Sequence, residues 1–401
     1  MEEERRNWIV NTQVLYNFIS CIRLPHQPLS VEFLPELSWR RERVGDVTFQ
    51  HIACGLQAEP GEKVALYVIE VALPAEPLKE EIRRYSQCVD YEGFPIPGYS
   101  EPMYQCVSKA YLDCDVSSLR SHTYGDRSFL AAKGKDVYLY DIGSGIKEDE
   151  DMRPILTFED HEESGYGLVF HKTEPLLGSC SEDSIVNIWD INAGSLTYNF
   201  QYSEVLNSIE FLDHEKRALV AADDGHVLVL DFNSPDPVAK TARVTGAINT
   251  VTNHHLNADV FFTGSTTGVV HIWDYRRLDQ PIHEIKAHES PIIRLQLNNK
   301  CPTLLASAAE DATVRIFDLD AVHEEYEDED MSAAEGDQEE EEGPRELIFT
   351  HTGHVEQVYD FCWSTYDVTE TFVASVGEDY CLQLWQMSDD ILNDSDEEEE
   401  T

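Results

Sequence analysis

The hexapeptide VNIWDI at residues 186–191 carries the pattern that decides the fold, because variants of it return along the chain. The pattern is apolar, any residue, apolar, aromatic or apolar, Asp, apolar. Its Asp residues stand at 141, 190, 231, 274 and 318, with spacings of 49, 41, 43 and 44 residues. A last copy, LQLWQM at 382–387, has Gln386 in place of Asp, and a weaker copy, VALYVIEV, lies at 64–71. The chain therefore contains seven related units.

Each unit has the character of a small β-sheet. The endings are nearly continuous runs of Val, Ile, Tyr and Trp, which are typical of a strand buried on both faces. A second apolar stretch and a polar, hairpin-like turn precede the ending, as in PLLGSCSEDSIVNIWDI at 175–191. Three strands are visible and a fourth fits in the linker. Units of about 40–45 residues with four short strands are propeller blades, so the sequence predicts an all-β, seven-bladed β-propeller.

Acidic residues are concentrated in short runs. The chain has 401 residues, and 29 Lys and Arg against 77 Asp and Glu give a formal net charge of −48. Twelve acidic residues and no basic ones lie between Glu324 and Glu342, and eight more lie between Asp389 and Glu400. Such runs cannot bury apolar area, so we expect a solvated insertion at 321–346 and a disordered tail at 389–401. Composition leaves two interpretations open, a solubilising segment and an electrostatic collector for a basic partner.

The charge and the missing motifs exclude several functions. A polyanion repels nucleic acid and anionic membranes, so we expect no direct binding to either. No apolar run approaches the roughly 20 residues of a membrane span. The sequence has no phosphate-binding glycine loop, nucleophile elbow, HExxH motif or Cys/His group with zinc-ligand spacing. We therefore expect no enzyme activity, no cofactor and no metal site.

The units resemble WD repeats, in which a loop His, a strand Ser, a turn Asp and the Trp of the ending form a buried hydrogen-bonded set. The matching residues are His161, Ser181, Asp183 and Trp189; His288, Ser307 and Asp311, with Phe317 in place of Trp; and His354, Ser375, Asp379 and Trp385. The unit that ends at Trp273 lacks the His and the Asp. Catalytic triads use the same residue types, but a set that recurs at one place in three blades indicates a structural role.

The segment before the first repeat has a helical pattern. Apolar residues at i, i+1, i+4, i+5 and i+8 predict one face of a helix over residues 1–24. These residues are Val14, Leu15, Phe18, Ile19 and Ile22. Pro25 and Pro28 would end the helix, and residues 29–34 would form the next strand. The predicted domains are this helix, a propeller over 25–388 with the acidic insertion 321–346, and the tail 389–401.

The flanking segments resemble a more particular family, the retinoblastoma-associated histone-binding WD-repeat proteins, which include the small subunit of chromatin assembly factor. The similar segments are the opening, with Trp8, Asn11, Thr12, Leu15, Tyr16 and FLPEL at 33–37; HEESGYGLVF at 161–170; GPRELIFTHTGH at 343–354; and LWQMSDDILND at 384–394. The resemblance spans the full chain. It implies a histone-binding chaperone or scaffold subunit of chromatin assembly, modifying or remodelling complexes, located in the nucleus with a cytoplasmic pool.

The family's histone site implies a groove in this chain between the N-terminal helix and the acidic insertion of the sixth blade. A helix of histone H4 would bury its apolar side there and pair its Arg and Lys side chains with glutamates. The residues assigned to the groove are Val14, Leu15, Phe18, Ile22, Glu339, Glu340, Glu341, Glu342, Gly343, Pro344, Leu347, Ile348 and Phe349. The implied partners are histones H3 and H4 and subunits of acetyltransferase, deacetylase, methyltransferase and assembly complexes.

A second family site lies on the flat top of the propeller and takes basic tails, including that of histone H3. Tyr166, Asn249 and Glu378 match it. Residues that are not acidic stand where the family has acidic ones, which leaves open a different peptide or none; they are Cys106, Ser164, Asn207 and Pro291. Two other functions remain as alternatives: a glutamate-rich WD-repeat chaperone of a basic ribosomal protein in ribosome biogenesis, and a generic propeller adaptor. The LWQM ending and the GPRELIF segment favour histone binding.

Overall fold

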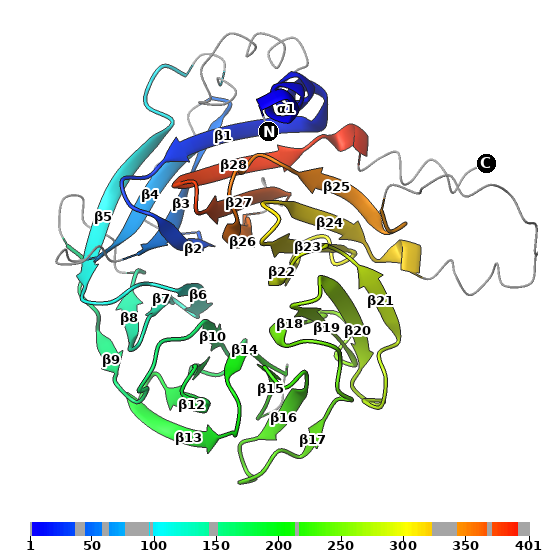
Figure 1. Cartoon of the computed structure of the whole chain (residues 1–401). Helices are drawn as coiled ribbons and strands as arrows, with labels where there is room; N and C mark the ends of the chain where they lie inside the picture. Colours follow the sequence, from blue (N-terminus) through cyan, green and yellow to red (C-terminus); the bar gives the residue numbers. More distant parts are fainter. Residues whose placement is uncertain are drawn as a thin grey trace, which may run out of the picture.

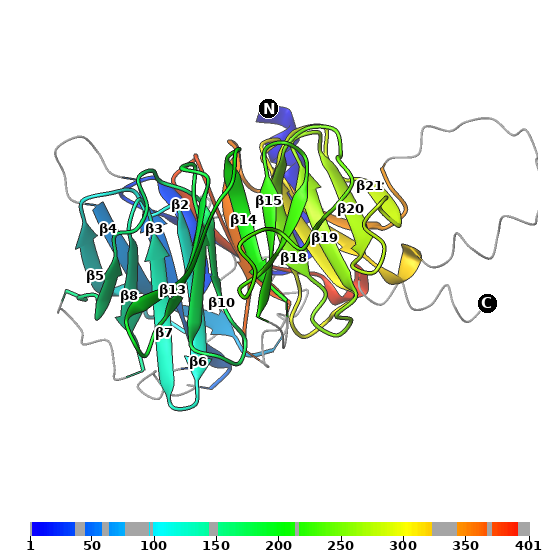
Figure 2. The ribbon, with the colours of Figure 1, turned by 90° about the horizontal axis from the view of Figure 1, so that it is seen from below.

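Seven four-stranded antiparallel sheets are arranged around a central axis in the computed structural model of the chain (Figure 1). The structure describes residues 2–36, 45–57, 64–76, 96, 99–143, 151–212, 216–322, 343–366 and 371–391. Turned by 90°, the same sheets stand side by side as the blades of a disc (Figure 2). The predicted all-β, seven-bladed propeller with an N-terminal helix is therefore confirmed.

The first two strands of each repeat form the inner half of a blade. The innermost strands, which face the axis, are β2 (Pro28–Phe33), β6 (Ser118–Tyr124), β10 (Gly167–Phe170), β14 (Leu206–Phe211), β18 (Ile248–Asn253), β22 (Ile292–Leu297) and β26 (Val358–Trp363). The second strands are β3 (Val47–Leu56), β7 (Arg127–Lys133), β11 (Leu176–Cys180), β15 (Arg217–Ala222), β19 (Val260–Ser265), β23 (Leu304–Ala309) and β27 (Phe372–Gly377). The strand expected at residues 29–34 is β2.

The seven recurring endings are the third strands of the seven blades. They are β4 (Val64–Pro74), β8 (Val137–Asp141), β12 (Ile185–Asp190), β16 (Val227–Asp231), β20 (Val269–Asp274), β24 (Val314–Asp318) and β28 (Cys381–Met387). A third strand has a hydrogen-bonded neighbour on each side and a blade against each face. In β16, Val227, Leu228, Val229 and Leu230 are all fully buried, which explains why these strands are apolar at consecutive positions.

The outer strands complete the blades, and the last blade takes its outer strand from the N-terminus. They are β5 (Tyr104–Leu112), β9 (Leu156–Phe158), β13 (Ser195–Gln201), β17 (Ala239–Lys240), β21 (His283–Lys286), β25 (Leu347–His351) and β1 (Tyr16–Arg23). β1 pairs antiparallel with β28, with Ile19 opposite Trp385 and Ile22 opposite Leu382. The two ends of the propeller sequence are thereby joined, and the ring is closed by backbone hydrogen bonds.

The predicted helix over residues 1–24 is too long. The helix α1 spans Glu2–Leu15, and the strand β1 begins at Tyr16. Phe18, Ile19 and Ile22 suit a helical face, but all of them are buried on β1. A strand at this place supplies partners for the edge of β28, which would otherwise be exposed. Pro25 and Pro28 therefore follow a strand and do not end a helix.

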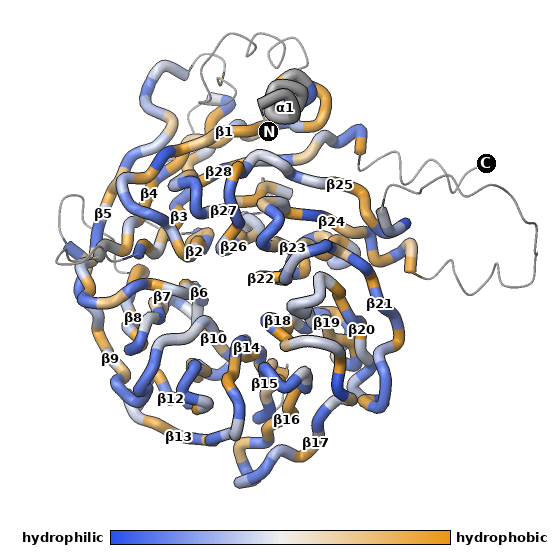
Figure 3. The backbone as a smooth tube through the Cα atoms, viewed as in Figure 1, coloured by the Kyte–Doolittle hydropathy of each residue, from blue (hydrophilic) through white to orange (hydrophobic). Residues whose placement is uncertain are grey.

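Apolar side chains fill the spaces between adjacent blades. Hydrophobic stretches run along the strands, and hydrophilic residues gather in the turns (Figure 3). Trp189, Trp273 and Trp385 are each fully buried at equivalent places on three third strands. Burial of one large side chain contributes up to about 3 kcal/mol, so the repeated packing between blades is the main source of stability.

Polar groups on the innermost strands link neighbouring blades near the axis. The Thr250 hydroxyl accepts a hydrogen bond from the Leu295 amide at 3.3 Å. Asp360 Oδ2 accepts one from the Val31 amide at 3.1 Å, and Asp360 Oδ1 lies 3.5 Å from Arg294 Nε. Burial, followed by repulsion from Arg120, lowers the pKa of Arg294 to about 10. The charges near the axis are thus held by a network that spans several blades.

Candidate functional site

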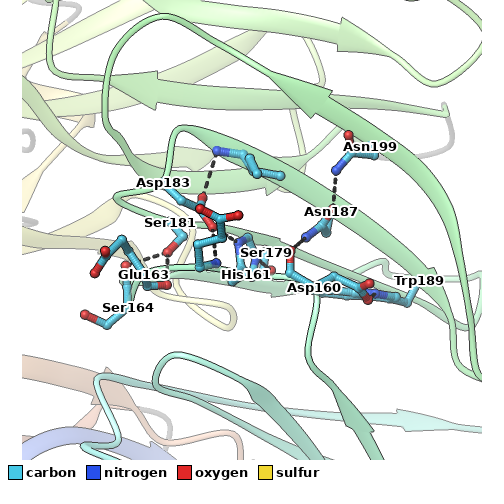
Figure 4. A network of polar contacts seen from close by, with 12 residues as sticks. Asp160, His161, Glu163, Ser164, Ser179, Ser181, Asp183, Asn187, Trp189 and Asn199 are labelled. Carbon is cyan, nitrogen blue, oxygen red and sulfur yellow. Dashed lines mark hydrogen bonds and ion pairs between the residues drawn. The ribbon is translucent and has the colours of Figure 1, made fainter.

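The first predicted His–Ser–Asp–Trp set lies in the third blade (Figure 4). His161 Nδ1 lies 2.9 Å from Asp183 Oδ2, and His161 Nε2 lies 2.6 Å from the hydroxyl of Ser179. The serine of the set is therefore Ser179, and the assignment of Ser181 is wrong. The Ser181 hydroxyl donates instead to the carbonyl oxygens of Glu163 and Ser164. The spacing Ser-x-x-x-Asp, which the other two sets share, would have selected Ser179 from the sequence.

The geometry of this set is that of a neutral, structural histidine. Asp183 can only accept, so Nδ1 of His161 donates to it and Nε2 accepts from Ser179. Burial, followed by the nearby positive charge of Lys133, lowers the pKa of His161 to about 4. Both His161 and Ser179 are buried, so a substrate has no access to this triad-like arrangement. The indole N–H of Trp189 donates to Asp160 at 2.9 Å and not to the serine.

The two other predicted sets have the expected partners. His288 Nδ1 lies 2.8 Å from Asp311, and its Nε2 lies 2.6 Å from Ser307. In the seventh blade, the ring of His354 lies between Asp379 at 3.1 Å and Ser375 at 2.8 Å.

The Trp position of these sets varies. Trp385 Nε1 donates to Ser375 at 3.2 Å, whereas Phe317 takes this place in the sixth blade. In the fifth blade, which lacks the His and Asp, Trp273 Nε1 donates to the Thr263 hydroxyl at 3.1 Å. Threonine at the serine position therefore preserves part of the set in the degenerate unit.

α1 lies beside the strand that follows the acidic insertion. The ring of Trp8 on α1 lies 6.3 Å from that of His351 at the end of β25. Tyr16, the first residue after α1, lies 5.3 Å from Phe349 in the middle of β25. Leu15 and Ile348, one from each segment, pack against the same hydrophobic cluster. The N-terminal segment and the end of the insertion, which are more than 320 residues apart in the sequence, are thus neighbours.

The predicted groove residues divide into accessible and buried ones. The accessible residues are Val14, which is 72% exposed, and the partly exposed Leu15, Gly343, Pro344, Leu347 and Ile348. Phe18, Ile22 and Phe349 are 0%, 2% and 4% exposed. Phe18 packs on Phe372 inside the last blade, with ring centroids 5.5 Å apart. These three side chains belong to the core, because β1 and β25 are strands of the blades, and the expectation that they contact a partner is wrong.

The rest of the acidic wall lies partly beyond what the structure describes. Glu339, Glu340, Glu341 and Glu342 fall outside the described residues, as does the tail from residue 392. The described base of the insertion begins with the short 3₁₀ helix η2 (Asp320–Val322) and resumes at Gly343. The φ of Gly343 is +112°, a conformation that favours glycine.

Two residues that the sequence did not point to anchor the end of the insertion. Glu346 is 7% exposed, and its Oε1 lies 2.7 Å from Nε2 of His283 on β21 of the fifth blade. The carbonyl of Glu346 also accepts a hydrogen bond from the Asp318 amide at 2.8 Å. Both ends of the insertion are thereby held together and fixed to the neighbouring blade. No local sequence pattern reveals this contact, because its partners lie 63 residues apart.

The residues assigned to the top-face site have different environments. Tyr166 is 61% exposed, and burial, followed by the charges of Glu182, Tyr359 and Asp115, raises its pKa. Asn249 donates to the carbonyl of Ile292 at 2.8 Å, so its amide already links two blades. Glu378 is exposed in the turn between β27 and β28.

The described residues contain no group of three or more His, Cys, Asp or Glu side chains placed to hold a metal ion. Within the same parts of the chain, no helix has the length and apolar character needed to cross a membrane.

Comparisons with known proteins agree with this architecture. Residues 152–190, 279–318 and 345–386 match the model of the WD domain, G-beta repeat. These segments contain the three His–Ser–Asp sets. Residues 3–75, which include α1, β1, β2 and β3, match the model described as histone-binding protein RBBP4 or the CAF1C component of the CAF1 complex.

Two curated relatives align with nearly the whole chain. A protein named histone acetyltransferase type B subunit 2 from Candida glabrata is 23% identical over 399 residues, which cover 98% of this chain and 90% of the relative. A protein of the same name from Kluyveromyces lactis is 24% identical over 400 residues, which cover 98% of this chain and 93% of the relative. These matches give no support to the ribosomal-protein alternative.

The fold and its repeated polar sets define the class of protein, a WD-repeat β-propeller. The match at the N-terminus is more particular, because it covers the helix and the strand that closes the ring. The chain belongs to the RBBP4/CAF1C family of histone-binding WD-repeat proteins.

Proposed function

We propose that this chain is a histone-binding scaffold subunit and that it holds a helix of histone H4, within H3–H4, between α1 and the acidic insertion. One observation carries the proposal: α1 lies against β25, the strand that directly follows the insertion. The proposed groove has an apolar floor beside an acidic wall, and this combination fits a cationic amphipathic helix.

The accessible residues on both sides suit such a ligand. On one side, Val14 is exposed and Leu15 partly exposed; on the other, Leu347 and Ile348 are partly exposed. The insertion carries twelve acidic residues and no basic ones between Glu324 and Glu342. In our proposal, Glu339, Glu340, Glu341 and Glu342 pair with Arg and Lys side chains of the histone helix.

The role that we propose is binding and presentation of the histone, without catalysis. The polar sets that resemble triads are buried, and the N-terminal family model is named for histone binding. The curated relatives are named as subunits of a histone acetyltransferase. We propose a place in such a complex, or in deacetylase, methyltransferase or assembly complexes, and a location in the nucleus with a cytoplasmic pool.

The test is a titration with a fluorescently labelled peptide of the first helix of histone H4. We expect saturable binding that weakens as salt is added. Val14→Glu should weaken it at least tenfold, because the charge would face the apolar side of the peptide. The matched control is Leu256→Glu: Leu256 lies between β18 and β19 of the fifth blade and is 74% exposed, as Val14 is 72% exposed. Absence of saturable binding, or equal effects of both variants, would contradict the proposal.

We also propose a second contact for a basic peptide on the top face. The exposed ring of Tyr166 stands near the acidic groups of Glu182 and Asp115, which raise its pKa after burial. Glu378 adds a charge on the seventh blade. A peptide of the histone H3 tail should bind to this face independently of the H4 helix. A Tyr166→Ala variant that binds the H3 peptide as well as the unmodified chain would refute this second contact.

A further inference from the structure

We propose that Tyr16 is a positioning residue that braces the two sides of the groove against each other, so that the groove is formed before the ligand arrives. Tyr16 is the first residue of β1 and directly follows the last residue of α1. It is fully buried. The proposal rests on the proposed function for its meaning in binding, but the brace itself is a property of the free chain.

The ring of Tyr16 touches both sides of the groove and the last blade. Its centroid lies 6.2 Å from that of Trp8 on α1 and 5.3 Å from that of Phe349 on β25. It also lies 5.7 Å from His351 at the end of β25 and 6.4 Å from Trp385 on β28. All four contacts are edge-to-face, the arrangement that aromatic pairs favour. One side chain therefore connects the helix, the strand after the insertion and the closing blade.

The hydroxyl of Tyr16 adds a directional link between the same two segments. Trp8 Nε1 donates to it at 3.1 Å, and its oxygen lies 2.9 Å from His351 Nδ1. Indole can only donate, so the hydroxyl oxygen accepts from Trp8 and its proton goes to His351. Burial, followed by the neighbouring His354, holds the pKa of His351 well below its usual value, so its Nδ1 is free to accept.

The acceptor is itself fixed in the last blade. The ring of His351 stacks on Trp385, with centroids 4.4 Å apart and an angle of 7°. The other end of the helix is held by its backbone, because the carbonyl of Leu15 accepts a hydrogen bond from the Ser388 amide at 2.9 Å. α1 is therefore tied near its C-terminus by the backbone and one to two turns earlier by Trp8. The second tie decides the angle of the helix relative to β25.

A braced groove should bind more tightly than one that the ligand must assemble, because ordering a segment on binding lowers the affinity. Removing the hydroxyl while keeping the ring separates bracing from packing. Tyr16→Phe deletes the link from Trp8 to His351 and leaves the aromatic contacts. The matched control is Tyr202→Phe, which deletes a 2.8 Å hydrogen bond to Asp224 in another blade.

The experiment measures amide hydrogen exchange in the free, full-length chain and binding of the H4 helix peptide. In Tyr16→Phe we expect faster exchange over residues 8–15, unchanged exchange in the third to fifth blades and about tenfold weaker peptide binding. Tyr202→Phe should leave exchange of α1 and peptide binding unchanged. Trp8→Phe, which removes the donor, should reproduce the effect, and the double variant should be no worse than either single variant because all three break one chain of hydrogen bonds.

The possible results separate the two proposals. Unchanged exchange of α1 in both Tyr16→Phe and Trp8→Phe would overturn the brace, whatever the peptide does. Faster exchange with unaltered peptide affinity would also overturn it as a positioning device. If the unmodified chain binds no peptide, the proposed function fails, while the exchange data still decide whether Tyr16 holds α1 against β25. If Tyr16→Phe does not fold, Trp8→Phe supplies the same comparison.

Discussion

Phe18 and Val14 lie four residues apart, yet the structure gives them opposite roles, and truncating each to alanine tests this directly. Phe18 is fully buried on β1 and packs on Phe372. Val14 is 72% exposed on α1. A continuous helix over both residues would place them on the same face, whereas the change from helix to strand at Tyr16 separates them. The two variants therefore test the helix boundary as well as the groove.

The expected magnitudes follow from burial. Deleting a fully buried Phe side chain costs about 3–5 kcal/mol of unfolding free energy, which lowers the thermal midpoint by about 5–10 °C in a chain of this size. Val14→Ala should change the unfolding free energy by less than about 0.5 kcal/mol. It should instead weaken the H4 helix peptide about fivefold, because two methyl groups of the contact are lost.

Thermal unfolding followed by circular dichroism, together with the peptide titration at 20 °C, measures both effects. Phe18→Ala should bind the peptide almost normally once the folded fraction is taken into account. Phe261→Ala is the matched control: this ring is 1% exposed and stacks on Trp273 in the fifth blade, so it should lower the midpoint by a similar amount. If Phe18→Ala weakened binding and left the midpoint unchanged, both the strand assignment and the argument from burial would be refuted.

Three further predictions concern charge. The pKa of His161, about 4 in the folded chain against about 6.5 unfolded, lowers the unfolding free energy by up to about 3 kcal/mol as pH falls from 6.5 to 4 and has no effect above that window; urea unfolding at several pH values measures it, and His161→Gln should flatten the slope. Arg294→Met leaves the buried Asp360 without its cation and should cost about 3 kcal/mol in the same assay, whereas a neutral result would contradict the network at the axis. Glu346→Ala breaks the contact with His283 and should speed amide exchange at residues 347–349, which an unchanged exchange rate would disprove.

Most of the propeller could be predicted because each blade repeats the same physical problem. A third strand with a neighbour on each side needs apolar residues on both faces, and the period of the endings at Asp190, Asp231 and Asp274 counts the blades. The His–Ser–Asp sets could be predicted for the same reason. The error at Ser181 arose from treating two spacings as equivalent, although Ser307 and Ser375 both precede their Asp by four residues.

The boundary of the N-terminal helix could not be predicted from periodicity. A strand that is buried on both faces has apolar residues at both odd and even positions, so Phe18, Ile19 and Ile22 fit a helical face equally well. What decides between them is the edge of β28, more than 350 residues later in the sequence, which needs a fourth strand. The contacts of Tyr16 with Phe349 and His351 were hidden for the same reason, because they exist only after the ring has closed.

The acidic insertion and the apolar floor have different consequences for recognition. Twelve acidic residues between Glu324 and Glu342 attract any cationic protein, but at physiological salt this attraction extends only about 8 Å and distinguishes poorly between basic partners. Selection must come from contacts that depend on shape, and the described floor offers few of them: Val14, Leu15, Leu347 and Ile348. A small apolar contact selects a ligand only if its parts are fixed relative to each other. A chain with the same charge but an unbraced α1 would therefore collect basic proteins without discriminating between them, and the burial of Tyr16 between both sides is what makes the groove selective in our proposal.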